Sequence, residues 1–246
     1  VIECNWKVAW EAFIESYHTV QTHPQIMPYL GDSNSQYDCW GDNISRTISP
    51  MGVVSPHLEG ITPNQTVNDW LEHGAWLTDG SQVEVPEGMS AREWLADYYF
   101  KHYSEQYQTD LASFCTHSEI MDSILYSLFP NFAPWAGFHP NLTYRMKPYG
   151  DNHEMCTMEI IVLMRFPEGQ ERPADCPVHK LGKDQLFSEA PGLEGGLGRV
   201  FDQDFSNLKM VQKGLKNLQS GEVVLANYQE VRIRHFHQTL DKYINA

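Results

Sequence analysis

The feature that most constrains this chain is a pair of apolar segments joined by a short polar turn. NLTYRMKPYG spans residues 141–150, and EMCTMEIIVLMRF spans residues 154–166. Two runs rich in Ile, Val, Met and Tyr on either side of such a turn predict an antiparallel hairpin. The second run is almost continuously apolar, so we expect it in the middle of a sheet, where both faces are covered.

The rest of the chain shows helical and extended patterns without a repeating strand-helix-strand order. Helical periodicity is found at residues 6–22, 90–111, 203–218 and 228–244. Strand-like segments are 35–40, 43–54 and 123–135, the last running into a loop, and 167–199 is expected to be a long loop. Ser90 and Glu93 have the spacing of a capping box. These patterns predict an α+β fold and, because no linker divides them, one domain over residues 1–246.

The charge and the cysteine content exclude some classes of partner. The chain of 246 residues carries a net charge of −15, which argues against nucleic acid or an anionic membrane surface as a partner. No apolar stretch reaches the roughly 18 residues of a transmembrane helix. The five cysteines are scattered and favour a reducing cytoplasm over a disulfide framework. We interpret the start VIECNWK, which has no Met, as the beginning of a fragment.

Two histidines near the N-terminus raise the question of a metal site. His18 and His23 are five residues apart, and Pro24 follows directly. On a continuous helix of about 3.6 residues per turn their side chains would diverge by about 140°. They converge only if the helix ends between them, and Pro24 favours extended geometry at His23. The spacing alone favours a surface His18 and a capping His23, so a metal needs support from a third ligand.

Asp204 is the candidate third ligand. It lies four residues before Leu208, on the apolar stripe of the predicted helix 203–218, so it points toward the core. A buried carboxylate without a partner is costly, and a metal would offset that cost. The alternative is an acid favoured by the helix dipole, which fits Asp202 equally well. Two His and one Asp would match a non-haem Fe(II) oxygenase, although zinc hydrolases use similar ligands.

The motifs NWK…F…E.YH….HP near the N-terminus and FDQD…….Q near the C-terminus resemble a known family. They are similar to the catalytic domain of the α subunit of Rieske-type ring-hydroxylating oxygenases. The His-x4-His spacing, the LFPNF segment (128–132) and the eight residues from Asp204 to Gln212 match that family. The resemblance covers essentially the whole chain. It implies a helix-grip (START/Bet v 1-like) fold, in which a curved antiparallel sheet wraps onto helices.

The same resemblance implies the cofactors and the partners. A mononuclear Fe(II) would be held by His18, His23 and Asp204. Glu15, three residues before the first ligand, would link an iron ligand to a Rieske [2Fe-2S] cluster on a neighbouring subunit; a solvated helix face is the alternative for Glu15. O2 would be the oxidant, and NAD(P)H would supply electrons through a reductase, with or without a ferredoxin. The family implies a homotrimer or an α3β3 assembly.

Two Cys-His pairs match the residue types and the local spacing of a Rieske cluster signature. Cys115-x-His117 and Cys176-x-x-His179 offer the residue types that such a cluster needs, but some sixty residues separate them. The predicted central strands lie between the pairs. We therefore expect neither pair to bind the cluster, and we place the cluster in an N-terminal domain upstream of this chain.

The predicted function is the insertion of oxygen into an aromatic or other apolar small molecule. The walls of the substrate pocket are expected in the Met-rich and aromatic middle of the chain, where core packing is the alternative role for each residue. The candidates are Met121, Leu125, Phe129, Met158 and Ile160. Two rival functions remain: a non-catalytic carrier of hydrophobic ligands, which helix-grip folds also form, and a zinc hydrolase on the same triad.

Overall fold

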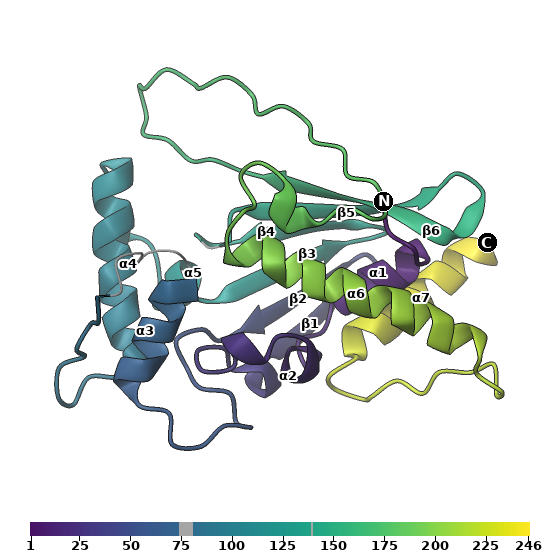
Figure 1. Cartoon of the computed structure of the whole chain (residues 1–246), viewed down its shortest axis with the longest axis horizontal. Coiled ribbons are helices and arrows are strands. Elements are labelled where there is room, and N and C mark those ends of the chain that lie inside the picture. The colour runs from purple at the N-terminus through teal and green to yellow at the C-terminus, as the bar shows by residue number, and fades with distance from the viewer. Residues whose placement is uncertain (74–80, 139) are drawn as a thin grey trace.

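One antiparallel sheet forms the centre of the computed structural model, which describes residues 1–73, 81–138 and 140–246 (Figure 1). Within those residues its six strands follow one another in chain order. They are β1 (Gln36–Trp40), β2 (Ile44–Ser49), β3 (Ser123–Leu128), β4 (Phe132–Ala136), β5 (Leu142–Tyr149) and β6 (Asn152–Val162). The predicted hairpin is confirmed as β5–β6, with Met146 opposite Met158.

The helices α1 (Trp6–Ala12), α6 (Gly196–Lys216) and α7 (Val231–Ile244) pack against this sheet (Figure 1). The main core lies between the two layers and joins Trp10 of α1, Phe201 of α6 and Phe236 of α7 to the inner side chains of the sheet. Alternate strand residues are buried there, as expected when one face of an antiparallel sheet is covered. The predicted α+β class is confirmed, and the curved sheet packs around its helices as in a helix-grip domain.

A second core cluster lies beyond one end of the sheet. It is built by α3 (Pro63–His73), α4 (Ala91–Tyr107) and α5 (His117–Met121) around Trp70, Leu95 and Tyr99. The capping box of Ser90 and Glu93 starts α4 as predicted. Helix α3 was not among the helices predicted from the sequence, although the Thr62 hydroxyl accepts the backbone N–H of Gln65 at 3.2 Å as a cap does. Among the described helices, none combines the length and the hydropathy that a membrane span requires.

The position predicted for β6 is wrong. This strand lies at the edge of the sheet and pairs only with β5 among the named strands. The N-terminal segment covers part of its free edge, because Ile2 and Cys156 exchange two backbone hydrogen bonds at 2.9 and 3.0 Å. The apolar run continues past this cover, so Leu163 and Met164 are exposed. A run of apolar residues therefore does not distinguish a central strand from an edge strand.

Other element boundaries also differ from the pattern. Residues 123–135 form the hairpin β3–β4 instead of one strand that runs into a loop. The helix predicted over 203–218 begins earlier, at Gly196, and the last helix begins at Val231. Short 3₁₀ turns complete the structure at Pro24–Ile26, Asp32–Asn34, Leu111–Ser113 and Phe187–Glu189.

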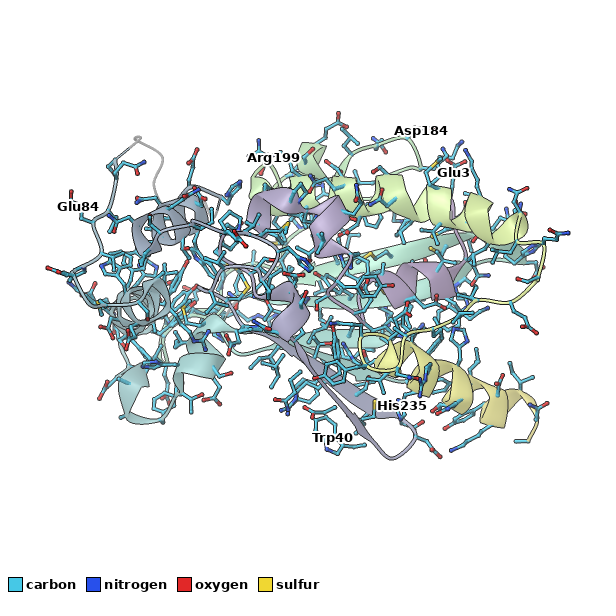
Figure 2. The ribbon with its side chains drawn as sticks, turned by 90° about the horizontal axis from the view of Figure 1, so that it is seen from below. Glu3, Trp40, Glu84, Asp184, Arg199 and His235 are labelled. Atoms are coloured by element: carbon cyan, nitrogen blue, oxygen red, sulfur yellow. The ribbon has the colours of Figure 1, made fainter. Side chains whose placement is uncertain are left out.

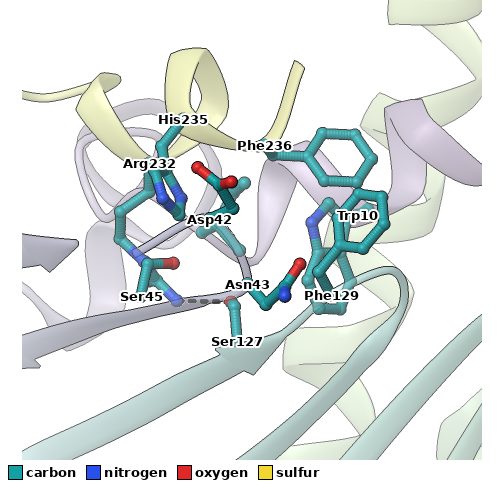
Figure 3. A pocket seen from close by; sticks show the side chains of 10 residues that line it. Trp10, Asp42, Asn43, Ser45, Ser127, Phe129, Arg232, His235 and Phe236 are labelled. Carbon is teal, nitrogen blue, oxygen red and sulfur yellow. Dashed lines mark hydrogen bonds between the residues drawn. The ribbon is translucent and has the colours of Figure 1, made fainter. Parts of the chain in front are cut away.

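A buried arginine attaches α7 to the sheet. The guanidinium of Arg232 is fully buried and donates to the hydroxyls of Ser45, Thr47 and Ser127 and to the carbonyl of Leu125. Burial lowers the pKa of Arg232 to about 9. The same residue borders a small cavity of about 10 Å³ that Trp10 and Phe129 also line (Figure 3). This volume is enough for about one water molecule, so the cavity is too small for an organic ligand.

The β1–β2 turn closes over the same helix. His235 of α7 and Trp40 at the end of β1 lie in neighbouring parts of the molecule (Figure 2), and the Nε2–H of His235 donates to the Gly41 carbonyl at 2.8 Å. At the opposite side, Glu3 pairs with Lys183 and Lys209, which connects the N-terminal segment to the 163–195 connection and to α6.

Two of the three glycines of α6, Gly198 and Gly214, differ in the space around them. A Cβ at Gly198 would lie 2.0 Å from the Leu193 carbonyl oxygen, whereas a Cβ at Gly214 would meet nothing within 4 Å. We expect Gly198→Ala to destabilise the chain by about 2–3 kcal/mol through overpacking. Gly214→Ala should stabilise it by up to about 1 kcal/mol through helix propensity. Urea unfolding of both variants measures the difference, and equal effects would contradict the tight packing at the start of α6.

Candidate metal centre

The chain leaves the path of α1 before it reaches the histidines. The helix predicted over residues 6–22 ends at Ala12 and resumes only at Thr19, so the prediction is wrong over residues 13–18. Ser16 stabilises the turn that follows, because its hydroxyl lies 2.7 Å from both the Ser35 hydroxyl and the Tyr37 hydroxyl. Ser16 is itself buried. The chain therefore leaves the helix where the buried Ser16 side chain makes hydrogen bonds to another segment of the chain.

A separate single-turn helix then stands between the two histidines. This helix, α2, spans Thr19–Thr22, with His18 at its N-cap and His23 at its C-cap. Pro24 begins the next turn, and His23 has φ −127° and ψ 52°. The two imidazoles come together, with ring centroids 5.3 Å apart. The convergence needed for a metal therefore depends on the end of the helical turn at His23, where the backbone leaves helical geometry before Pro24.

Helix α6 brings Asp204 to the same place. Phe201, Asp204 and Leu208 are all buried along one stripe of this helix. The Oδ1 atom of Asp204 lies 2.8 Å from Nε2 of His23 and 3.6 Å from Nε2 of His18. One ligand atom from each residue lies within 4.8 Å of the others, and this is the group among the described His, Cys, Asp and Glu side chains that could share an ion.

These three ligands fit a metal ion that keeps open coordination positions. Donors at about 2.0–2.2 Å from one ion lie at most about 4.4 Å apart, so the triad needs only small side-chain shifts to hold one. Asp204 is buried, and its carboxylate faces the two imidazoles. A buried carboxylate facing two nitrogen donors gains most from a cation placed between them. Two His and one carboxylate suit iron as well as zinc.

Asp202, the competing carboxylate, has a different set of partners. Its two oxygens accept the backbone N–H groups of Phe187 and Ser188 at 2.6 and 3.3 Å, and the Ser188 hydroxyl at 2.6 Å. These bonds attach the 3₁₀ turn Phe187–Glu189 to α6. The structure thus brings Asp204 to the histidines and gives Asp202 a role in anchoring a loop.

Glu15 lies directly behind His18. Its Oε1 is 2.5 Å from Nδ1 of His18, and its Oε2 accepts the backbone N–H of the same residue at 3.0 Å. Glu15 is only 9% exposed, so it does not belong to a solvated helix face. Burial alone would lower the pKa of His18, but the hydrogen bond to Glu15 and the charges of Glu15 and Asp204 outweigh burial and raise it.

Removing the charge of Glu15 is expected to lower the pKa of His18. Glu15→Gln keeps an oxygen acceptor near Nδ1 but removes the negative charge that favours the imidazolium. In the metal-free chain, an NMR titration of the His18 ring should therefore show its midpoint at a lower pH in the variant. The same titration with Glu11→Gln, on α1 and bonded to His237, serves as the control. An unchanged His18 midpoint would contradict the Glu15 contact.

The second histidine has a neutral partner that sequence patterns did not indicate. Nδ1 of His23 lies 2.9 Å from Oε1 of Gln203, which also accepts Nε2–H of Gln25 at 2.7 Å. The only sequence signal for this contact is that Gln203 directly precedes Asp204. His23 is nearly inaccessible at 3% exposed, whereas the His18 side chain is 26% exposed.

An aromatic wall stands beside the carboxylate. Tyr144 of β5 contacts the rings of Phe13 and Phe201, with centroids 5.1 and 5.9 Å away. Burial raises the pKa of Tyr144, and the nearby charge of Asp204 adds to this effect. Trp135 lies on the other side of Tyr144, at 6.1 Å. The environment of the triad is therefore apolar and aromatic.

The residues predicted to line a substrate pocket fall into two groups. Leu125 and Met158 are buried in the main core, and Phe129 and Ile160 pack against its margin. Met121 lies in the second cluster with α3 and α4. Their contact with a substrate stays a prediction.

The two Cys-His pairs that match a Rieske signature lie outside the candidate metal centre. Cys176 and His179 are exposed, and neither pair belongs to the group of described residues that could hold a metal.

The fold and the site together define a class: an α+β domain with a largely buried 2-His-1-carboxylate set, as in non-haem iron oxygenases. A family model described as "Ring hydroxylating alpha subunit (catalytic domain)" matches residues 1–246. The chain therefore belongs to the ring-hydroxylating α-subunit family and represents its catalytic domain. Membership implies an iron-dependent oxygenase that works with electron-transfer partners in a multimeric assembly. Comparisons with curated proteins and with solved structures gave no match.

Proposed function

We propose that this chain is the catalytic domain of a Rieske-type oxygenase that inserts oxygen from O2 into an aromatic or other apolar substrate. The observation that carries the proposal is the convergence of His18, His23 and Asp204, three donors in a chain of the ring-hydroxylating family. Mononuclear Fe(II) held by these residues would supply the redox chemistry that activates O2.

The side chains around the triad have separate tasks in this proposal. Asp204 supplies the one anionic ligand, and its place on a long helix gives the site a rigid support. Tyr144 and Phe201 exclude water from one side and offer an apolar surface, which supports an apolar substrate. Leu125, Phe129, Met158 and Ile160 are proposed as further substrate contacts.

Glu15 and His18 form the proposed route for electrons. His18 is the more exposed ligand, and Glu15 bonds to its outer nitrogen at 2.5 Å. This geometry supports the family-implied role of the carboxylate as the link to a Rieske [2Fe-2S] cluster on a neighbouring subunit. NAD(P)H would supply the electrons through a reductase, with or without a ferredoxin.

The proposed assembly is a homotrimer or an α3β3 complex. The exposed apolar side chains at residues 161–164 support the presence of a protein interface. A cytoplasmic location is also proposed, and it is supported by the five scattered cysteines, an odd number that does not suit a disulfide framework.

Isotope labelling tests the proposed reaction. The iron-loaded protein receives reduced electron-transfer partners, an aromatic substrate panel and ¹⁸O2, and the products are analysed by mass spectrometry. Two labelled atoms in the product indicate dioxygenation and one indicates monooxygenation; both support the proposal. In a parallel reaction of the zinc-loaded protein with unlabelled O2 in H2¹⁸O, a product labelled only from water would contradict it in favour of hydrolysis. Binding of the apolar compounds without turnover or metal would contradict it in favour of a ligand carrier.

A further inference from the structure

The two histidines of the triad have chemically different partners on their outer nitrogens. Nδ1 of His18 faces the Glu15 carboxylate at 2.5 Å, and Nδ1 of His23 faces the Gln203 amide oxygen at 2.9 Å. A carboxylate partner makes an imidazole a stronger donor, while an amide oxygen fixes its orientation without adding charge. The site is therefore asymmetric in charge.

The Gln203 amide is held in the orientation that His23 requires. For Nε2 of His23 to offer a lone pair to a metal ion held between it and Asp204, the proton must reside on Nδ1, and the partner of Nδ1 must then be an acceptor. Gln203 presents Oε1 at that position. Gln25 supports this orientation from the next turn, because its Nε2 donates to the same Oε1 at 2.7 Å and its Oε1 accepts Nε2–H of Gln203 at 3.4 Å.

We propose that Gln203, supported by Gln25, is a positioning residue that holds His23 as the Nδ1–H tautomer and keeps this side of the site uncharged. The inference rests on the proposed iron site. A glutamate at position 203 would add a third carboxylate around the triad, where Glu15 and Asp204 are already buried. Because added negative charge favours the more oxidised metal ion, the neutral amide keeps the reduction potential of bound iron higher than a carboxylate would.

Metal affinity and reduction potential test this role without turnover. The dissociation constants for Fe(II) and Zn(II) are measured by anaerobic competition with a chelator in the native chain, Gln203→Leu, Gln203→Glu and Gln212→Leu. Gln212 is the matched control, because it lies on the same helix and its Oε1 accepts a backbone N–H, that of Asn5, at 2.9 Å. Gln203→Leu should weaken binding of both metals about 10–100-fold, whereas Gln212→Leu should leave both constants unchanged.

The glutamate variant separates positioning from simple structural support. Gln203→Glu keeps the acceptor, so it should retain the affinity that Gln203→Leu loses, and it should lower the reduction potential of bound iron. If Gln203→Leu fails to fold, the retained affinity and the lowered reduction potential of Gln203→Glu still test the inference. Unchanged affinity in Gln203→Leu, or an unchanged potential in Gln203→Glu, would overturn the inference. A native chain that binds neither metal would overturn the proposed function itself, and Gln203 with it.

Discussion

The chain with Asp204→Ala is expected to contain almost no iron after anaerobic loading, while the native chain contains about one iron per chain. Four-ligand structural zinc sites are worth about 10–16 kcal/mol, or about 3 kcal/mol per ligand. Loss of one of three ligands should therefore weaken binding more than about 100-fold, and Fe(II) binds more weakly than Zn(II) from the start. Plasma mass spectrometry of the desalted protein gives the iron content.

Asp202→Ala is the matched control for this experiment. The residue lies two positions earlier on the same helix, and its carboxylate accepts hydrogen bonds from Phe187 and Ser188 instead of facing the histidines. This variant should lose some stability, because it frees a loop, but it should retain its iron. Loss of iron in Asp202→Ala with retention in Asp204→Ala would reverse the assignment of the ligand.

Phe201→Ala is expected to destabilise the metal-free chain by about 3–5 kcal/mol. Phe201 is 1% exposed, and its ring packs between Tyr144 of the sheet and Phe187 of the loop, at 5.9 and 5.6 Å. Truncation to alanine leaves a cavity between the sheet and α6, and the surrounding side chains fill it only in part. Urea unfolding followed by far-ultraviolet circular dichroism measures the free energy of unfolding.

Phe205 offers the comparison for Phe201 on the same helix. It is only half-buried and packs mainly on Phe187, at 4.5 Å. Phe205→Ala should therefore cost about half as much as Phe201→Ala or less, because less apolar surface is lost from the core. Equal losses in the two variants would contradict the central place of Phe201 between α6 and the sheet.

Local patterns predicted some features of the fold correctly, because their causes are local. The capping box of Ser90 and Glu93 needs only residues three apart, and it starts α4. The hairpin β5–β6 follows from two apolar runs and one turn. The helix predicted over 6–22 is interrupted over residues 13–18, because the Ser16 hydroxyl bonds to Ser35 and Tyr37, contacts that no helical pattern contains. The edge position of β6 depends on the pairing of Ile2 with Cys156, which are distant in the chain.

The candidate site was partly predictable for the same reason. The inward phase of Asp204 follows from the spacing to Leu208, and both residues are buried on one stripe. The choice between Asp204 and Asp202 needed the positions of Phe187 and Ser188, which come from a different segment. Gln203 was not predicted, because its position on the helix does not indicate a contact with a histidine that lies 180 residues away in the chain.

The most direct test of the metal site is anomalous diffraction at the iron edge, from crystals of the anaerobically loaded protein. The expected result is one strong peak at about 2.0–2.2 Å from Nε2 of His18, Nε2 of His23 and a carboxylate oxygen of Asp204. No peak between these three residues in protein that contains iron, or a peak held by other side chains, would contradict the assignment of the triad.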